Sequence, residues 1–489
     1  MTRRMDRLGF DNPLRVRFAP SSTGPLDVGA ARTALFNWLL ARASSGSFVV
    51  CIDDTGDSAR PGEDALLRDL RWLGLDWDEG PGTGAAAPAY RRSERGALYT
   101  AHVQRLLDAG SAYERDGALW FRVPPGTTVV HDLIKGDVAF DHDAIADFVV
   151  RKSNGTMTYD FIAAVDDATM RIDVVLRGDE HLDDTPRQML IARALGYEPP
   201  RYAHAALVVG ADRHKLSGAD GPVTVDALRR AGFLPEAVIE HLALLGWSAP
   251  DGREAFDLRE LVALFSLERV GHSPSVFDLD RLRAFNARAL RALSRERYRE
   301  LVIDAMQRHR LLEQPVPDAA VRWVDTFVEA FGDEVHTLGE ALEAVAALRE
   351  EAATIPALEL ERLRNRQVLF FLDAVAQYVD AQPELRGLPL ASDLPIIASE
   401  FGLSRKDAFE AVRMALTGSH DGPPLALLFP LLGHDRIMIR IGAVNSHILH
   451  GRGLEPIKYG PGGAPFETIQ PTPPGRPEYG ATERGDVVS

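Results

Sequence analysis

The chain has 489 residues, of which 45% are hydrophobic and 26% charged, and its formal net charge is −16. This length predicts several domains that each bury a core, and the acidic balance excludes nonspecific coating of nucleic acid but not a folded RNA at a local basic face. The single cysteine, Cys51, excludes an internal disulfide and a cysteine-built zinc site. Because the sequence has no signal peptide and no apolar run that would cross a bilayer, we expect a cytoplasmic protein that does not enter the membrane.

The stretch from Leu14 to Arg42 predicts a strand, a turn and a helix in succession. Apolar residues recur on one face of this helix at Ala31, Leu35, Phe36, Leu39 and Leu40. A strand, a turn rich in glycine and serine and a helix N-terminus form an anion site, because free backbone N–H groups and the helix dipole point at the turn. The stretch therefore favours a nucleotide-binding α/β domain, with an ordinary capped βα unit as the alternative.

Further elements follow in chain order. Residues 47–52 are apolar and rich in β-branched side chains, which predicts a buried strand. This strand ends at Asp53, and functional residues of doubly wound sheets lie just past the carboxyl ends of strands. We expect helices over 65–75 and 99–109, and short strands over 120–123, 128–133, 137–140 and 148–152.

The second half of the sequence predicts helices. The chain turns helical from Val225 onward, and residues 289–382 show amphipathic helical spacing. The segment after His450 is rich in proline and glycine, so we expect it to be disordered or extended.

The amino-acid motifs in these segments resemble those of one protein family. The first signature of that family is Arg-x-Ala-Pro-Ser-Pro-Thr-Gly-x-x-His-x-Gly, and the chain matches it at Arg17, Ala19, Pro20, Ser21, Thr23, Gly24 and Gly29. The segments DLRWLGLDWDEGP, YRRSER and GFLPEAVIEHLALLGWS are further matches, and residues 158–196 match along their whole length. From Leu14 to Ile441 the chain therefore resembles the glutamyl-tRNA synthetases, which are class I aminoacyl-tRNA synthetases.

The resemblance implies a fold and an order of domains. We expect an α/β, doubly wound parallel (Rossmann-like) catalytic domain with a shortened, strand-containing insertion that has no zinc site, followed by all-α tRNA stem-contact and anticodon-binding domains. The expected boundaries are 14–110 and 159–212 for the two halves of the catalytic domain, 111–158 for the insertion, 213–294 for the stem-contact region, 295–385 for a helical domain, 386–445 for the anticodon-binding domain and 446–489 for the disordered tail.

The resemblance also implies an acidic amino acid as substrate, glutamate or a relative. The residues expected to bind it are Arg17, Ala19, Ser21, Asp53, Tyr159 and Arg177. Asp53 stands where the family has a glutamate that faces the amino group of the substrate. A guanidinium at Arg177 suits the side-chain carboxylate of glutamate, which it can hold bidentately. The alternative for Arg177 is a structural ion pair with Asp179 or Glu180.

An adenine nucleotide and tRNA are the other partners that the resemblance implies. We expect ATP or AMP, with or without magnesium, and no zinc. The residues expected to contact the nucleotide are Ser21, Thr23, Gly24, Gly29, Glu180, His181, Leu207 and Val208. We expect a monomer.

Four departures from the family pattern fall on the phosphate side of this site. Asp27 stands where the family has the first histidine of its ATP-binding motif. In the third signature the family reads Lys-Leu-Ser-Lys-Arg-His-Gly, and this chain keeps Lys215 and Ser217 but has Gly218, Ala219 and Asp220 in place of lysine, arginine and histidine. All four changes move the local charge toward negative.

These changes bear on the catalytic candidates Asp27, Lys215, Ser217 and Gly218. ATP activation needs positive charge where negative charge moves onto the leaving pyrophosphate, and losing one such donor costs about 10²–10³ in rate. A carboxylate aimed at phosphates adds repulsion. We expect Arg32, His214 and Lys215 to compensate in part.

Three functions are compatible with this pattern. The first is a glutamate–tRNA ligase with an altered ATP site, and the second is a paralogue that transfers the glutamyl group of preformed glutamyl-tRNA in a specialised pathway. The third is a non-catalytic protein that binds tRNA or a partner on a synthetase scaffold. We favour an enzyme, and glutamate-dependent ATP–pyrophosphate exchange separates the first function from the other two.

Overall fold

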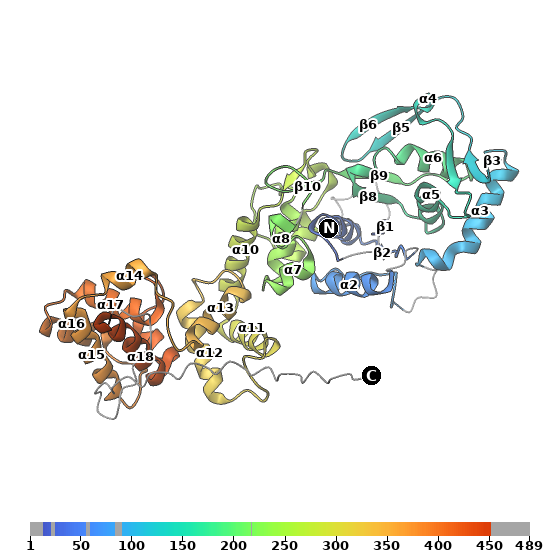
Figure 1. Ribbon diagram of the computed structural model, residues 1–489. Helices are drawn as coiled ribbons and strands as arrows, with labels where there is room; N and C mark the ends of the chain where they lie inside the picture. Colours follow the sequence, from blue (N-terminus) through green and yellow to red (C-terminus); the bar gives the residue numbers. More distant parts are fainter. Residues whose placement is uncertain (1–12, 21–24, 55–58, 84–89, 217, 451–489) are drawn as a thin grey trace, which may run out of the picture. The chain divides into compact units, whose positions relative to one another are not determined.

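The computed structural model describes residues 13–20, 25–54, 59–83, 90–216 and 218–450 (Figure 1). The chain divides into two compact units. Unit 1 consists of residues 1–293 with 336–340, and unit 2 consists of residues 294–335 with 341–489. The predicted tail after residue 450 lies outside the described residues.

A six-stranded sheet forms the centre of unit 1. Its order is β2-β1-β8-β9-β5-β6, and every neighbouring pair is parallel except the hairpin β5–β6. The strands are β1 (Arg15–Phe18), β2 (Ser47–Val50), β5 (Thr127–Asp132), β6 (Gly136–Asp141), β8 (Val174–Gly178) and β9 (Arg201–Ala205). The mostly parallel order confirms the Rossmann-like prediction.

Helices cover both faces of this sheet. Along β8, Val174 and Leu176 lie in the apolar cluster that includes α1 (Val28–Ala43), whereas Val175 lies in the cluster that includes Met189 of α6 (Thr185–Ala194). Successive residues of a strand point to opposite faces, so a strand buried on both sides is apolar throughout. The sheet is therefore doubly wound, as expected.

Helix α1 differs from the one-faced helix that its spacing suggested. Arg32, Asn37 and Trp38 are buried as well as the apolar residues of the predicted face. The reason is that α1 lies between the sheet and the helices α8 (Pro235–Leu244) and α9 (Leu258–Leu264). A helix enclosed on two sides buries polar side chains only where they find partners.

The strands of the inserted segment separate into two groups. β3 (Ala112–Arg115), β4 (Ala118–Phe121) and β7 (Phe148–Arg151) form their own antiparallel sheet, while β5 and β6 extend the main sheet. β3 was not predicted, because its sequence AYER contains no β-branched residue. The insertion is thus partly built into the catalytic sheet.

Shorter elements complete unit 1. The remaining helices are α2 (Ala59–Trp72), α3 (Gly96–Asp108), α4 (His142–Ile145), α5 (Tyr159–Thr169), α7 (Val225–Arg230) and α10 (Leu279–Ala292). The 3₁₀ turns are Arg92–Arg95, Asp179–His181, Gly218–Asp220 and Leu267–Arg269. A two-stranded parallel sheet joins β10 (Val208–Val209) to β11 (Ser275–Val276).

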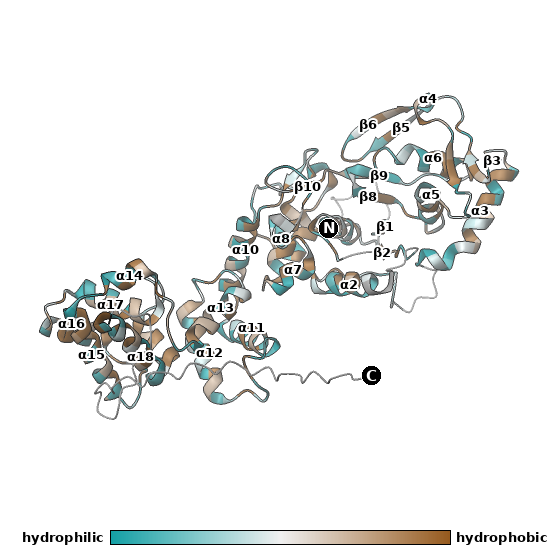
Figure 2. Ribbon diagram, in the orientation of Figure 1, coloured by the Kyte–Doolittle hydropathy of each residue, from teal (hydrophilic) through white to brown (hydrophobic). Residues whose placement is uncertain are grey.

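Unit 2 is built from helices in the residues that the structure describes. These are α11 (Arg295–Arg308), α12 (Asp318–Phe331), the greater part of α13 (Leu338–Arg349), α14 (Ala357–Arg362), α15 (Arg366–Asp380), α16 (Leu390–Glu400), α17 (Arg405–Thr417) and α18 (Leu425–His450). α18 bends at Gly433, whose φ is 75°, and packs against α12, α15 and α17. Apolar residues concentrate on these packed helices (Figure 2).

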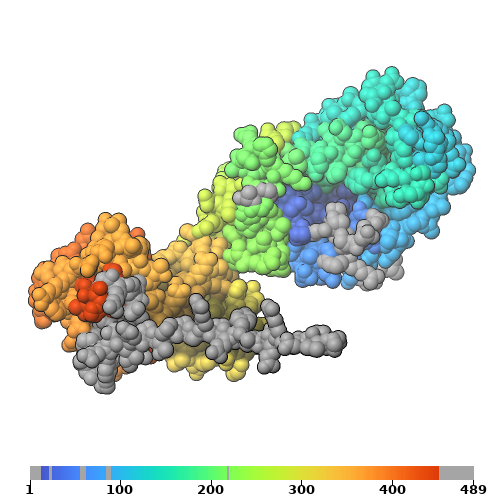
Figure 3. Space-filling model, in the orientation of Figure 1, coloured from blue at the N-terminus to red at the C-terminus, as the bar shows by residue number. Residues whose placement is uncertain are grey.

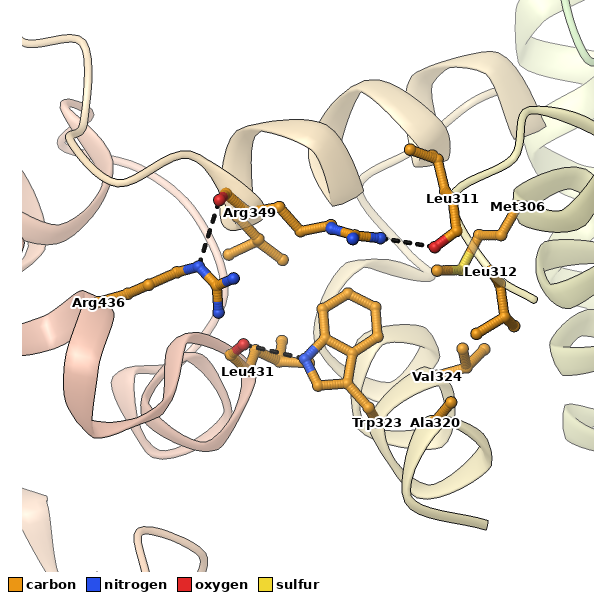
Figure 4. A pocket seen from close by; sticks show the side chains of 10 residues that line it. Met306, Leu311, Leu312, Ala320, Trp323, Val324, Arg349, Leu431 and Arg436 are labelled. Atoms are coloured by element: carbon orange, nitrogen blue, oxygen red, sulfur yellow. Dashed lines mark hydrogen bonds between the residues drawn. The ribbon is translucent and has the colours of Figure 1, made fainter. Parts of the chain in front are cut away.

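A cavity of about 220 Å³ lies within unit 2. Trp323 borders it and donates from Nε1 to the Leu431 carbonyl at 2.9 Å, and Arg349 donates to the Leu311 carbonyl at 2.6 Å (Figure 4). Arg436 donates from Nε to the Arg349 carbonyl at 3.2 Å. Over the described part of the chain, no helix is long and apolar enough to cross a membrane.

Candidate active site

Asp27 is the N-cap of α1. Its Oδ1 accepts the Ala30 N–H at 2.7 Å, and its backbone is extended, with φ −77° and ψ 165°. The Val28 N–H donates to the Val223 carbonyl at 3.0 Å. The prediction of free amides at this helix N-terminus is therefore corrected: of the first three N–H groups of α1, only that of Gly29 lacks a partner among the described residues.

The start of α1 is joined to the segment that follows the third signature. The Val225 N–H donates to the Leu26 carbonyl at 2.9 Å, the reciprocal of the bond from Val28 to Val223, and Asp27 pairs with Thr224 in an antiparallel bridge. In Figure 3 the blue residues of the early chain border the green segment of this region. Asp27 therefore lies against the segment that follows the third signature, about 200 residues later in the chain.

Arg32 does not compensate for the missing positive charge as expected. It is 3% exposed and donates from Nη2 to the Ala206 carbonyl at 2.6 Å and from Nη1 to the Leu245 carbonyl at 3.3 Å. Burial lowers the pKa of Arg32 to about 10 despite the carboxylates of Asp179 and Glu180 nearby. Its guanidinium is committed to backbone carbonyls, so it is a structural residue here.

The loop of the third signature keeps few cations in the described residues. Arg213, His214 and Lys215 are exposed, and the backbone N–H of His214 donates to the Asp212 carboxylate at 2.8 Å. The carboxylate of Asp220 covers Gly210, because a Cβ built on Gly210 would meet the Asp220 Oδ1 at 2.3 Å. Two carboxylates therefore accompany the one lysine of this loop.

Arg17 is buried beneath the carboxyl end of β1. Its Nε and Nη2 donate to the two carboxylate oxygens of Asp167 at 2.9 and 3.1 Å. Burial alone would lower the pKa of Arg17, but the Asp167 carboxylate more than offsets it, so the pKa is raised. Arg17 therefore stays charged and is held rigidly, with Nη1 facing away from Asp167. Ala19 packs against the apolar cluster on the same face of the sheet.

Asp53, Tyr159 and Arg177 belong to one connected group of side chains. Arg92 forms an ion pair with Asp53 and lies over the ring of Tyr159, with its guanidinium carbon 5.4 Å from the ring centroid. The Tyr159 ring lies 5.6 Å from that of His181, whose carbonyl accepts from Arg177 Nη2 at 3.1 Å. The contacts thus bring together side chains from four separate segments.

Arg177 is enclosed by neutral partners. Besides the His181 carbonyl, it donates from Nε to His204 at 3.1 Å, from Nη1 to Gln188 at 3.0 Å and from Nη2 to Thr185 at 2.8 Å. Of its five N–H bonds, one on Nη1 has no partner in the described part of the chain. A bidentate contact with a substrate carboxylate therefore requires at least one of these bonds to break.

The alternative of an ion pair from Arg177 to Asp179 or Glu180 is not found in the described residues. Asp179 accepts from Lys135 Nζ at 2.7 Å, and Glu180 lies 4.0 Å from His181 Nε2. Behind Arg177, His204 is fully buried and its Nδ1 lies 2.6 Å from the Asp132 carboxylate. Burial lowers the pKa of His204. The neutral ring therefore donates to Asp132 and accepts from Arg177, which fixes the orientation of the guanidinium.

Comparisons with known proteins identify the family. The family described as "tRNA synthetases class I (E and Q), catalytic domain" matches residues 13–119 and 114–284, and "Anticodon binding domain" matches residues 297–444. The chain is 36% identical over 487 residues to "Glutamate--tRNA ligase" of Desulfitobacterium hafniense, covering 90% of this chain and 100% of that protein. It is 38% identical over 473 residues to the protein of the same name from Carboxydothermus hydrogenoformans, covering 86% and 97%.

The chain belongs to the class I tRNA synthetases of the glutamate and glutamine type. A crystal structure of a glutamate tRNA ligase from Elizabethkingia meningosepticum in complex with its amino acid has a similar fold, with a TM-score of 0.78 and 22% identity over 89% of this chain and all of that chain. A glutamate-tRNA synthetase from Elizabethkingia anophelis gives a TM-score of 0.76 at 23% identity. The resemblance read from the sequence is thus confirmed.

The predicted nucleotide contacts of this synthetase-family chain are described only in part. Ser21, Thr23, Gly24 and Ser217 lie outside the described residues. Leu207 is 45% exposed, whereas the adjoining Val208 is buried in β10. Glu180 is exposed, and His181 lies 3.0 Å from the Asp184 carboxylate. The exposed Leu207 offers an apolar surface, and its contact with a nucleotide stays a prediction.

Sequence reasoning missed several residues that hold the predicted ones. The sequence predicted no role for Arg92, which lies within the YRRSER segment. Asp167, Asp132 and His204 carry no local signal, because their partners are 150 and 72 residues away in the chain. Only the fold brings these polar groups together.

Proposed function

We propose that this chain is a glutamate–tRNA ligase-type protein that binds an acidic amino acid, an adenine nucleotide and tRNA, and in which activation by ATP is strongly slowed. The observation that carries the proposal is the Asp27 carboxylate at the N-terminus of α1, bonded to Ala30 at 2.7 Å. A negative charge there occupies the donors and the dipole field that a phosphate would use.

The phosphate side has few cations to offset this charge. Arg32 is bonded to backbone carbonyls, and Gly218 replaces a lysine of the family pattern. Arg213, His214 and Lys215 are the basic side chains of the loop that the structure describes, beside the carboxylates of Asp212 and Asp220. Since phosphoryl chemistry is almost entirely positioning and charge stabilisation, this balance supports a slow first step.

ATP is the nucleotide that membership of the class I family supports, with magnesium as its usual ion. Among the described residues, no group of three histidine, cysteine, aspartate or glutamate side chains could hold a metal. A magnesium ion would therefore be carried largely by the phosphates, as its preference for a few carboxylates plus phosphate oxygens allows.

The amino-acid side of the site has more positive charge than the phosphate side. We infer that Arg17, Arg177 and Tyr159 contact an acidic amino acid, since the buried guanidiniums of Arg17 and Arg177 both lie near the buried ring of Tyr202, and Tyr159 is exposed beside them. The similarity to proteins named glutamate--tRNA ligase supports glutamate as the amino acid. For tRNA we propose the predicted stem contacts over 213–294 and anticodon contacts over 386–445. The "Anticodon binding domain" match over 297–444 supports an anticodon-binding role for the second half, without dividing it at residue 386.

Glutamate-dependent ATP–pyrophosphate exchange tests the proposal. The wild-type rate should be far below 1 s⁻¹, and Asp27→His combined with Gly218→Lys should raise it. Asp141→His is the matched control, because Asp141 caps the unrelated helix α4 by accepting the Asp143 N–H at 3.0 Å. A wild-type exchange rate of about 1 s⁻¹ or more would restore the plain ligase function.

If exchange is slow, the fate of charged tRNA decides between the remaining functions. Incubation with glutamyl-tRNA should leave the ester intact if the chain is a slowed ligase or a binding protein. Release or transfer of the glutamyl group would instead assign the chain as a paralogue that uses preformed glutamyl-tRNA.

A further inference from the structure

Asp53 is already paired with a cation of its own chain. The Arg92 guanidinium forms an ion pair with the Asp53 carboxylate, and Arg92 is only 10% exposed at its side chain. Tyr159 fixes Arg92 from the other side, because the guanidinium lies over its ring. A buried arginine held by an aromatic face and a carboxylate loses little entropy in keeping this geometry.

The other carboxylates around this group are paired as well. Asp167 holds Arg17, and Asp166 accepts from Arg95 Nε at 2.7 Å and from the Tyr99 hydroxyl at 2.9 Å. Asp160 accepts from Gln188 at 3.0 Å, and Asp184 lies 3.0 Å from His181. The exposed Glu180 lies 4.0 Å from His181 Nε2, so each of the carboxylates named here has a partner among the described residues.

Donors for anions remain available in the same place. Arg17 uses Nε and Nη2 for Asp167, which leaves Nη1 without a partner among the described residues. Arg177 retains one N–H on Nη1, and both guanidiniums are more than nine-tenths buried. Arg92 lies over the Tyr159 ring, and Arg177 lies over the ring of Tyr202, with its guanidinium carbon 5.5 Å from the centroid. The carboxylates of this group, in contrast, are already paired. Such a site favours carboxylates and offers an ammonium group no unshared carboxylate.

We propose that the ion pair with Arg92 keeps the Asp53 carboxylate from binding the α-ammonium of an amino acid. The site then binds dicarboxylates, and the α-ammonium contributes little to their affinity. The ligand class is short dicarboxylates, so glutamate, 2-oxoglutarate and glutarate bind comparably. This inference rests on the proposed acidic-substrate site and specifies that the site recognises the two carboxylates of its ligand. Arg92 is then a specificity residue, because removing it frees Asp53 to receive an ammonium.

The test is calorimetric titration of the full chain with L-glutamate, 2-oxoglutarate and glutarate. In the wild type the three dissociation constants should agree within about threefold. Arg92→Gln should tighten glutamate relative to glutarate by about tenfold, because a freed carboxylate gains a charge-assisted hydrogen bond. Adding Asp53→Asn to that variant should abolish the gain.

Arg91→Gln is the matched control, because the neighbouring arginine pairs with Glu63 and not with Asp53. It should leave the glutamate-to-glutarate ratio unchanged. Asp53→Asn alone provides a test that does not depend on the Arg92 variant, and it should change glutamate affinity by less than about threefold.

Two results overturn the inference in distinguishable ways. If the wild type binds glutamate at least about tenfold more tightly than glutarate, Asp53 receives the ammonium despite Arg92, and the inference fails while the acidic-substrate site stands. If none of the three ligands binds, the inference and the proposed site fail together.

Discussion

The Asp27 side chain is expected to affect both the stability of helix α1 and the binding of nucleotide phosphates. As an N-cap it satisfies the Ala30 N–H, and as an anion it opposes phosphates at the same place. The two effects separate in one substitution, because asparagine caps a helix about as well as aspartate but carries no charge.

We therefore expect Asp27→Asn to keep the stability of the protein within about 0.5 kcal/mol and to raise ATP affinity by about tenfold. Asp27→Ala should instead cost about 0.5–2 kcal/mol through loss of the cap. Urea unfolding and ATP titration on the same samples measure both quantities. An unchanged ATP affinity in the asparagine variant would place the carboxylate away from the phosphates.

Arg177 is the second residue whose role is open to direct measurement. Arg177→Ala should weaken glutamate binding by roughly 2–5 kcal/mol, because a desolvated charge pair would be lost. Arg193→Ala, which removes an exposed arginine at the end of α6, is the control for loss of charge alone. Equal glutamate affinity in the wild type and the Arg177 variant, with folding verified by circular dichroism, would remove Arg177 from the substrate contacts.

At the scale of elements, α8 carries a buried histidine that no partner satisfies. Both ring nitrogens of His241 lack a hydrogen bond in the described residues, and the ring packs edge-on against Phe277 and Phe285. Burial, followed by the nearby positive charge of Arg281, lowers the pKa of His241 to about 4. The folded protein thus keeps this ring neutral well below the ordinary pKa of histidine.

The unfolded chain therefore binds more protons than the folded chain between about pH 6.5 and pH 4, and the free energy of unfolding falls as the pH is lowered through this window. The contribution is about 3 kcal/mol at most. His241→Leu should reduce this acid sensitivity, measured as the change in urea midpoint between pH 7 and pH 4.5. The exposed His309→Leu should leave it as in the wild type, and equal pH dependence in all three proteins would contradict the assignment to His241.

The sequence predicted helices and strands well where a local residue pattern defines them. It did not predict arrangements that depend on pairing between residues far apart in the chain. The strands β1 and β2 were predicted from local apolar patterns, whereas the addition of β5 and β6 to the main sheet depends on pairing Asp132 with Tyr202. Likewise Arg17, Asp53, Tyr159 and Arg177 were predicted by motif, but the pairing of Asp53 with Arg92 was not. Whether these four residues line one substrate cleft stays a prediction.

For the whole molecule, the family and the fold are established while the chemistry is proposed. The doubly wound sheet, the helical second half and the similarity over about nine-tenths of the chain make it a class I synthetase of the glutamate and glutamine type. The departure at Asp27 lies against the segment that directly follows the 215–221 loop, because Leu26–Val28 pairs with Val223–Val225. We expect this clustered loss of positive charge to weaken contacts with the phosphates and to leave the adenosine side unaltered.

The most direct test of this account compares the affinities of AMP and ATP for the full chain by calorimetric titration. We predict that AMP binds at least as tightly as ATP, because the β- and γ-phosphates meet carboxylates in place of cations. A dissociation constant for ATP about tenfold or more below that for AMP would show that another group supplies the positive charge, and it would contradict the account.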